Sequence, residues 1–84
     1  MANANQDRRI VTLYTKPGCH LCEEAKDEIE LSGSDGFDLV EINIANDLDL
    51  YERYKNDIPV VFVNGVEAFR HRLTAREFLR ALNK

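Results

Sequence analysis

Cys19 and Cys22 are the only two cysteines of this 84-residue chain, and two residues separate them. They follow a short apolar run and a Lys-Pro-Gly turn, and a helical pattern begins directly after them. A thiol pair at this spacing can carry out thiol–disulfide exchange or bind a soft metal ion. Because the pair stands at the start of a predicted helix, the helix dipole and the free first-turn N–H groups favour a thiolate there.

The two thiols are expected to have different roles. Cys19 lies at the exposed edge of the predicted helix and is the candidate nucleophile, whereas Cys22 points back under the first turn and is the candidate resolving thiol. Lys16 and a protonated His20 add positive charge beside Cys19, and such settings lower a cysteine pKa from about 8.5 to roughly 3.5–7.5. The two glutamates after Cys22 oppose this shift, and an exposed His20 without a role is the competing interpretation.

The elements that must position this pair follow from hydrophobic spacing and turn residues. Asn64-Gly65 is a two-residue hairpin signal, and Thr74 with Glu77 forms a capping-box pattern that opens the last helix. Together these signals predict strands over 9–14, 37–44, 59–63 and 66–69, and helices over 19–31, from Asn46 or Asp47 to about 55, and from Thr74 onward.

Each element is expected to bury one side. The second strand alternates, so Val40, Ile42 and Ile44 are predicted on its inner face. The helices are predicted to bury Cys22, Ala25 and Ile29 in the first, Leu48, Tyr51 and also Leu50 and Tyr54 in the second, and Phe78, Leu79 and Leu82 in the third.

The predicted order is β-α-β-α-β-β-α. A helix joins the first two strands, so they should be parallel with a right-handed crossover, and the last two strands form an antiparallel hairpin. One mixed four-stranded sheet flanked by helices accounts for every element, which makes the fold class α/β. We expect one domain over residues 9–84 and a disordered tail over residues 1–8.

Composition narrows the functional classes. Hydrophobic residues make up 44% and charged residues 31% of the chain, as in an ordinary soluble domain. A net charge of −4 argues against nucleic-acid binding. No apolar run approaches about 18 residues, and the polar N-terminus has no signal-peptide pattern. We expect a cytoplasmic monomer without a membrane segment, a metal site or a bound cofactor.

Two segments resemble the thioredoxin superfamily and, within it, the glutaredoxin-like proteins. They are Leu-Tyr-Thr-Lys-Pro-Gly-Cys-His-Leu-Cys over 13–22 and Asp-Ile-Pro-Val-Val-Phe-Val-Asn-Gly over 57–65. The resemblance extends from Ile10 to Leu82 and includes the order of the elements. It implies a thioredoxin-like fold of the glutaredoxin type.

The resemblance also implies roles for single residues. Cys19 would be the nucleophile, Cys22 the resolving thiol, and Pro59 a cis-proline beside the dithiol. The N–H and C=O of Ile58 would pair with an extended peptide or with glutathione. Lys16 would place a charge near the thiolate or a substrate carboxylate.

The chain departs from the family pattern at two places. Glutaredoxins usually have Pro-Tyr between the cysteines and thioredoxins Gly-Pro, whereas this chain has His20-Leu21. Glutaredoxins also carry a Gly-Gly pair after the last strand, where this chain has Phe-Arg-His-Arg over 69–72. Side chains there crowd glutathione unless Arg70 or Arg72 binds its carboxylates, and Arg70 is therefore a predicted substrate-binding residue, as is His20.

Three functions are compatible with these residues. The first is a thiol–disulfide oxidoreductase that acts on protein disulfides or glutathione mixed disulfides and receives electrons from glutathione or a reductase. The second is a small metal or Fe–S carrier that uses the C-x-x-C pair. The third is a redox-inactive module that binds a partner protein.

Overall fold

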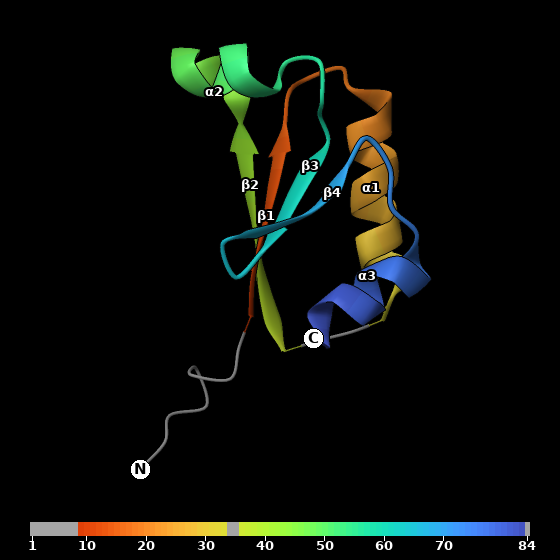
Figure 1. Cartoon of the computed structure of the whole chain (residues 1–84). Coiled ribbons are helices and arrows are strands. Elements are labelled where there is room, and N and C mark those ends of the chain that lie inside the picture. The colour runs from red at the N-terminus through yellow and green to blue at the C-terminus, as the bar shows by residue number, and fades with distance from the viewer. Residues whose placement is uncertain (1–8, 34–35, 84) are drawn as a thin grey trace.

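The computed structural model describes residues 9–33 and 36–83, so the predicted disordered tail over 1–8 lies outside the described residues. The predicted element order is confirmed, with one short 3-10 helix, η2, added after the second strand (Figure 1). The elements are β1 (Arg9–Thr15), α1 (His20–Leu31), β2 (Phe37–Asn43), η2 (Ile44–Asn46), α2 (Leu48–Tyr54), β3 (Val60–Val63), β4 (Val66–Arg70) and α3 (Ala75–Leu82).

The strands form one mixed sheet in the order β2-β1-β3-β4. The pairing of β1 with β2 is parallel and that of β3 with β4 is antiparallel, as the sequence predicts. The sequence left the pairing of β1 with β3 open, and it is antiparallel. Asn64 and Gly65 join β3 to β4 with left-handed φ values of 52° and 81°, the conformation that a two-residue hairpin favours. In the central pair, Tyr14 lies opposite Val60, so the end of β1 and the start of β3 meet at one edge of the sheet.

Two helices, α1 and α3, cover one face of the sheet, and α2 lies beyond the end of β2 (Figure 1). The predicted buried residues of α1 are confirmed, because Cys22, Ala25 and Ile29 are all buried. The main core under α1 and α3 consists of Val11, Leu13, Ala25, Ile29, Val61, Leu73, Phe78 and Leu82. A second buried cluster, here called the dithiol cluster, consists of Cys22, Ile44, Tyr54, Ile58 and Val60.

The inner face predicted for β2 is wrong at Val40, which is 42% exposed. Phe37 and Leu39, on the alternate positions, pack against the main core instead. Both faces of this strand are apolar in the sequence, so alternation by itself cannot choose between them. The parallel register decides, because Leu39 pairs with Val11, whose side chain points under the helix layer.

The segment after β2 also differs in detail from the prediction. Ile44 is buried as expected, but it belongs to η2 because the strand ends at Asn43. The Asp47 side chain accepts a hydrogen bond from the N–H of Leu50, which confirms one of the two predicted caps of α2. Leu48 was expected on the buried side and is 75% exposed, because this short helix faces the protein with Tyr54 and the partly buried Leu50.

The last helix begins as the sequence predicts. Thr74 and Glu77 form a complete capping box, and Phe78 and Leu82 are buried. Glu28 of α1 accepts a hydrogen bond from the backbone N–H of Ala75 at 2.8 Å. This bond satisfies one of the free N–H groups at the helix start and connects α3 to α1.

Two leucines of different burial test this description of the core. Leu13 is 1% exposed and Leu31 is 73% exposed. We expect Leu13→Ala to lower the free energy of unfolding by about 2–5 kcal/mol, because it leaves a cavity in the main core. The matched Leu31→Ala variant should change it by less than about 0.5 kcal/mol. Urea denaturation of both variants measures the difference, and equal losses would contradict the assigned core.

Candidate active site at the dithiol

Cys19 is the N-cap of α1. The chain turns at Gly18, which has a left-handed φ of 80°, and Cys19 itself is extended, with φ −91° and ψ 105°. Its Sγ accepts a hydrogen bond from the backbone N–H of Cys22 at 3.1 Å. The sulfur therefore occupies the position that an N-cap oxygen usually takes, at the positive end of the helix dipole.

Cys19 and Cys22 form a disulfide with a Cα–Cα distance of 5.2 Å, within the usual range for such a bond. Cys22 is only 3% exposed and belongs to the dithiol cluster, whereas Cys19 is half-buried and packs against that cluster from outside. A substrate can therefore reach the Cys19 sulfur more easily than the Cys22 sulfur.

The Ile58–Pro59 peptide bond is cis, as the family resemblance implied. Ile58 shares the dithiol cluster with Cys22, so the two segments that carry the resemblance pack together although 36 positions separate these residues. Figure 1 shows the same proximity in the backbone, because the loop before β3 and the loop before α1 lie at one end of the sheet.

The predicted use of both Ile58 peptide groups is corrected by the structure. The N–H of Ile58 donates to the carbonyl of Tyr54 at 3.1 Å, and the N–H of Asp57 donates to the same carbonyl at 2.8 Å. The last carbonyls of a helix have no partner within the helix, and here the segment after α2 supplies the donors. Only the Ile58 carbonyl is left to pair with a bound peptide.

Two lysines lie near the ring of Tyr51. Lys16 Nζ is 6.0 Å from the centre of the Tyr51 ring, and Lys55 Nζ is 5.8 Å from it. Tyr51 packs against the dithiol cluster, as does Cys19. The sequence predicted Lys16 but treated Tyr51 as core packing and gave Lys55 no role, although their i, i+4 spacing on a helix was a usable signal. His20 is exposed at the first position of α1.

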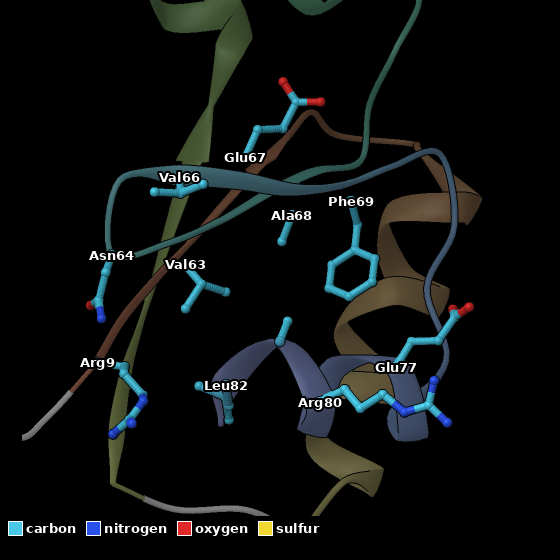
Figure 2. A pocket seen from close by; sticks show the side chains of 11 residues that line it. Arg9, Val63, Asn64, Val66, Glu67, Ala68, Phe69, Glu77, Arg80 and Leu82 are labelled. Carbon is cyan, nitrogen blue, oxygen red and sulfur yellow. The ribbon is translucent and has the colours of Figure 1, made fainter. Parts of the chain in front are cut away.

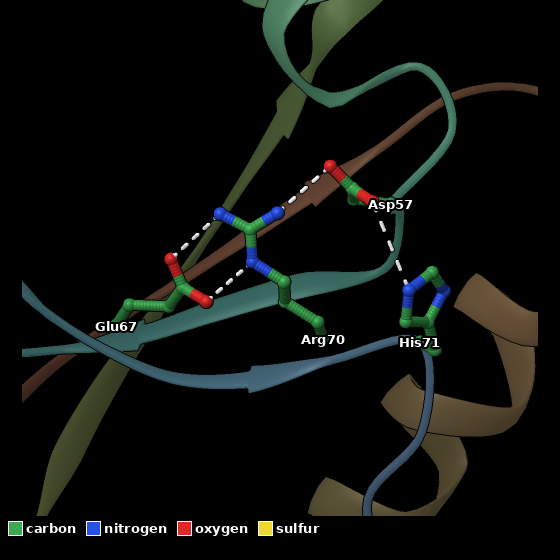
Figure 3. A network of polar contacts seen from close by, with 4 residues as sticks. All are labelled: Asp57, Glu67, Arg70 and His71. Carbon is green, nitrogen blue, oxygen red and sulfur yellow. Dashed lines mark hydrogen bonds and ion pairs between the residues drawn. The ribbon is translucent and has the colours of Figure 1, made fainter.

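Arg70, predicted to bind a substrate carboxylate, is instead paired with two carboxylates of the chain itself (Figure 3). Its Nε and Nη2 donate to Glu67 at 2.5 and 3.0 Å, and its Nη1 donates to Asp57 Oδ2 at 2.8 Å. His71 Nε2 lies 3.7 Å from the other Asp57 oxygen. The hydrogen bonds from Arg70 lower the pKa of Glu67, and those to Glu67 raise the pKa of Arg70.

An irregularity in β4 creates this pairing. Phe69 pairs with Val61, but Phe62 pairs with Glu67, so Ala68 is an extra residue of β4 between two partners. In a regular strand, residues three apart point to opposite faces. The extra residue brings Glu67 and Arg70 to the same face, which strand alternation in the sequence could not show.

His71 occupies the stretch where the family pattern has its glycine pair. Its φ is 71°, in the left-handed region that glycine adopts without a penalty. Its N–H donates to the carbonyl of Pro59 at 2.8 Å. The backbone conformation that glycine favours is thus present here with a histidine side chain, and it connects the end of β4 to the cis-proline.

Two surface grooves differ in their relation to these residues. A groove of about 490 Å³ between β4 and α3 has an apolar floor that includes Val63, Phe69 and Leu82 (Figure 2), and no predicted site residue lines it. A groove of about 530 Å³ is lined by Leu21, which lies between the two cysteines, and by His71, but neither cysteine lines it. We therefore assign the candidate site to the dithiol itself.

Two further predictions are that the chain has no metal site and no membrane segment. Within residues 9–33 and 36–83, no group of three or more His, Cys, Asp and Glu side chains is arranged to hold a metal ion. None of the helices in that part of the chain is long and apolar enough to cross a bilayer. The expected cytoplasmic location and monomeric state stay predictions.

The lowered pKa of Glu67 gives a pH test of the Arg70 pair. Its pKa in the folded protein lies below the usual 4.5, so the pair stabilises the fold above the unfolded pKa and loses this contribution as the pH falls through the folded pKa. We expect wild-type protein to be more stable than Glu67→Gln near neutral pH, and the two to converge as the pH falls through the lowered folded pKa of Glu67. Urea denaturation across this range measures both, and a constant difference would contradict the pairing.

Two solved structures with this fold share more than a quarter of their aligned residues with this chain. Target protein XcR50 from X. campestris has 26% identity and a TM-score of 0.75 over 87% of this chain and 95% of that one. Protein Ne2328 from Nitrosomonas europaea has 28% identity and a TM-score of 0.73 over 88% and 91%. The malarial thioredoxin-2, at 13% identity over 90% of this chain and 82% of that one, has a TM-score of 0.68 and shows the shared fold alone.

The sequence comparisons agree with the fold. The glutaredoxin-like protein YDR286C homolog of Dictyostelium discoideum is 29% identical over 70 residues, which are 75% of this chain and 65% of that protein. This chain thus spans less than two thirds of the length of that relative. Residues 10–83 match the family described as Glutaredoxin-like domain (DUF836), and this range contains both the cysteine pair and the cis-proline segment. The chain therefore belongs to the family described as Glutaredoxin-like domain (DUF836).

Proposed function

We propose that this protein is a dithiol thiol–disulfide oxidoreductase in which Cys19 attacks and Cys22 resolves. The observation that carries the proposal is the asymmetric pair at the start of α1. Cys19 is half-buried at the N-cap and its sulfur accepts the N–H of Cys22, whereas Cys22 is 3% exposed. An accessible sulfur that receives a hydrogen bond at a helix N-terminus is suited to exist as a thiolate.

The reduced protein would react in two exchanges. The Cys19 thiolate attacks one sulfur of the substrate disulfide, forms a mixed disulfide and expels the other sulfur as a thiolate, which takes a proton from water. The Cys22 thiol then loses a proton and attacks the Cys19 sulfur. This step forms the Cys19–Cys22 disulfide and releases the second substrate thiol. The substrate gains two electrons and two protons, and the protein dithiol is oxidised.

The surrounding residues support these steps. The N–H of Cys22 stabilises the Cys19 thiolate before it attacks the substrate disulfide. Lys16 adds a positive charge on the side of Tyr51. The Ile58 carbonyl would accept a hydrogen bond from the backbone of an extended substrate, while its N–H remains bonded to Tyr54.

A protein disulfide is the substrate that these contacts favour. Arg70, which could have received a glutathione carboxylate, already pairs with Asp57 and Glu67. The returning electrons would come from glutathione or a reductase. A reduction potential near −270 mV would fit a thioredoxin-like reductant, and one of about −200 to −230 mV a glutaredoxin-like role.

Cysteine variants test the assignment directly. We expect Cys19→Ser to abolish reduction of a disulfide-containing protein such as insulin, because no nucleophile remains. Cys22→Ser should instead accumulate a mixed disulfide through Cys19, because release needs the second thiol. Mass spectrometry detects the adduct, and Ser32→Ala, a change at the far end of α1, is the control. Full activity of Cys19→Ser would refute the assignment, and tight metal binding by the reduced, inactive protein would favour the carrier alternative.

The charge of Lys16 is testable by the pH dependence of alkylation. We expect Lys16→Gln to slow the alkylation of Cys19 near neutral pH in the reduced protein and to move the midpoint of its pH dependence upward, because it removes a positive charge three residues before the thiolate. The control variant is Lys26→Gln, because Lys26 Nζ pairs with Glu41 of β2 at 2.9 Å. Iodoacetamide alkylation rates across pH give both midpoints, and equal midpoints for the two variants would exclude this role for Lys16.

A further inference from the structure

The segment over 57–59, which carries the cis-proline, is attached to its neighbours at both ends. On one side, the N–H groups of Asp57 and Ile58 donate to Tyr54, the last residue of α2. On the other side, the Pro59 carbonyl accepts the N–H of His71 at 2.8 Å. These are main-chain bonds, and they leave the position of the Asp57 side chain to be set separately.

Arg70 sets that position by contacting three parts of the protein at once. Its Nη1 donates to Asp57 in the segment, and its Nε and Nη2 donate to Glu67 on its own strand (Figure 3). Its guanidinium carbon lies 5.9 Å from the centre of the Tyr54 ring, on α2. One planar side chain therefore connects β4, α2 and the cis-proline segment.

The charges make this connection stronger than an ordinary surface pair. A single exposed ion pair contributes little to stability, but a two-point contact within a network is the recognised exception. Without the guanidinium, the carboxylates of Asp57 and Glu67 would both lose their shared cation, and their like charges would repel each other. Loss of Arg70 thus removes an attraction and adds a repulsion, and both effects displace Asp57.

We propose that Arg70 is a positioning residue for the dithiol site, which holds Asp57 and thereby keeps Ile58 and cis-Pro59 in place for a docking substrate. This inference rests on the proposed oxidoreductase function. It replaces the expectation that Arg70 binds substrate itself. Arg70 touches neither cysteine, so its effect falls on substrate binding and leaves the thiol chemistry of Cys19 unchanged.

The test compares Arg70→Gln and Arg70→Lys with Arg76→Gln, a change at an exposed arginine of α3. The substrate is a cyclic peptide with one disulfide. For Arg70→Gln we expect KM to rise about fivefold with kcat nearly unchanged, which is the effect of losing roughly 1 kcal/mol of binding. Arg70→Lys keeps the charge but not the two-point geometry and should restore the KM only partly. Arg76→Gln should behave as wild type.

Two measurements that need no turnover complete the test. Iodoacetamide should alkylate Cys19 of the reduced Arg70→Gln protein at the wild-type rate. The backbone amides of Ile58 and His71 should exchange with solvent about tenfold faster in Arg70→Gln, while the amide of Ile29 in the main core keeps its wild-type rate. This pattern separates local displacement from global destabilisation.

The outcomes distinguish the two proposals. If wild-type protein shows no disulfide reduction, the proposed function fails, and the exchange rates of Ile58 and His71 still show whether Arg70 positions the segment. If Arg70→Gln keeps wild-type exchange at these two amides, or lowers kcat and the alkylation rate of Cys19 together, the positioning role is overturned.

Discussion

The antiparallel pairing of β1 with β3 is the constraint on which the candidate site depends. With Tyr14 opposite Val60, the turn that leads to Cys19 and the segment that ends at Pro59 leave the sheet at the same edge. A shift by one residue would reverse the face of every side chain in β3. Val60 and Val61 are both fully buried, one in the dithiol cluster and one in the main core, so burial on both faces fixes this register.

Polar contacts also help to position the candidate site. The extra residue in β4 places Glu67 and Arg70 on one face, and Arg70 in turn pairs with Asp57. Ile58 and Pro59 are buried, and because a domain of this size has a thin core, polar contacts add to this apolar packing. Main-chain bonds at Tyr54 and His71 together with the guanidinium of Arg70 hold the segment over 57–59 from three directions.

The two departures from the family pattern have different consequences. His20 and Leu21 leave the helix start intact, because the N-cap is made by the sulfur of Cys19 and the N–H of Cys22. The missing glycine pair is a larger change. His71 keeps a left-handed backbone conformation and its hydrogen bond to Pro59. Its side chain and that of Arg70 fill space at this edge, and Arg70 also brings a charge. The fold is therefore preserved while the surface that a substrate meets is different.

The sequence by itself determined the order of the elements, the helix start at Cys19, the hairpin at Asn64-Gly65 and the capping box at Thr74, because each depends on neighbouring residues. It also determined the cysteine pair and, through the family resemblance, the cis bond before Pro59. Tertiary structure alone decided the buried face of β2 and the partners of Arg70. Those features depend on strand register and on an extra residue in a strand, and contacts between distant segments set both.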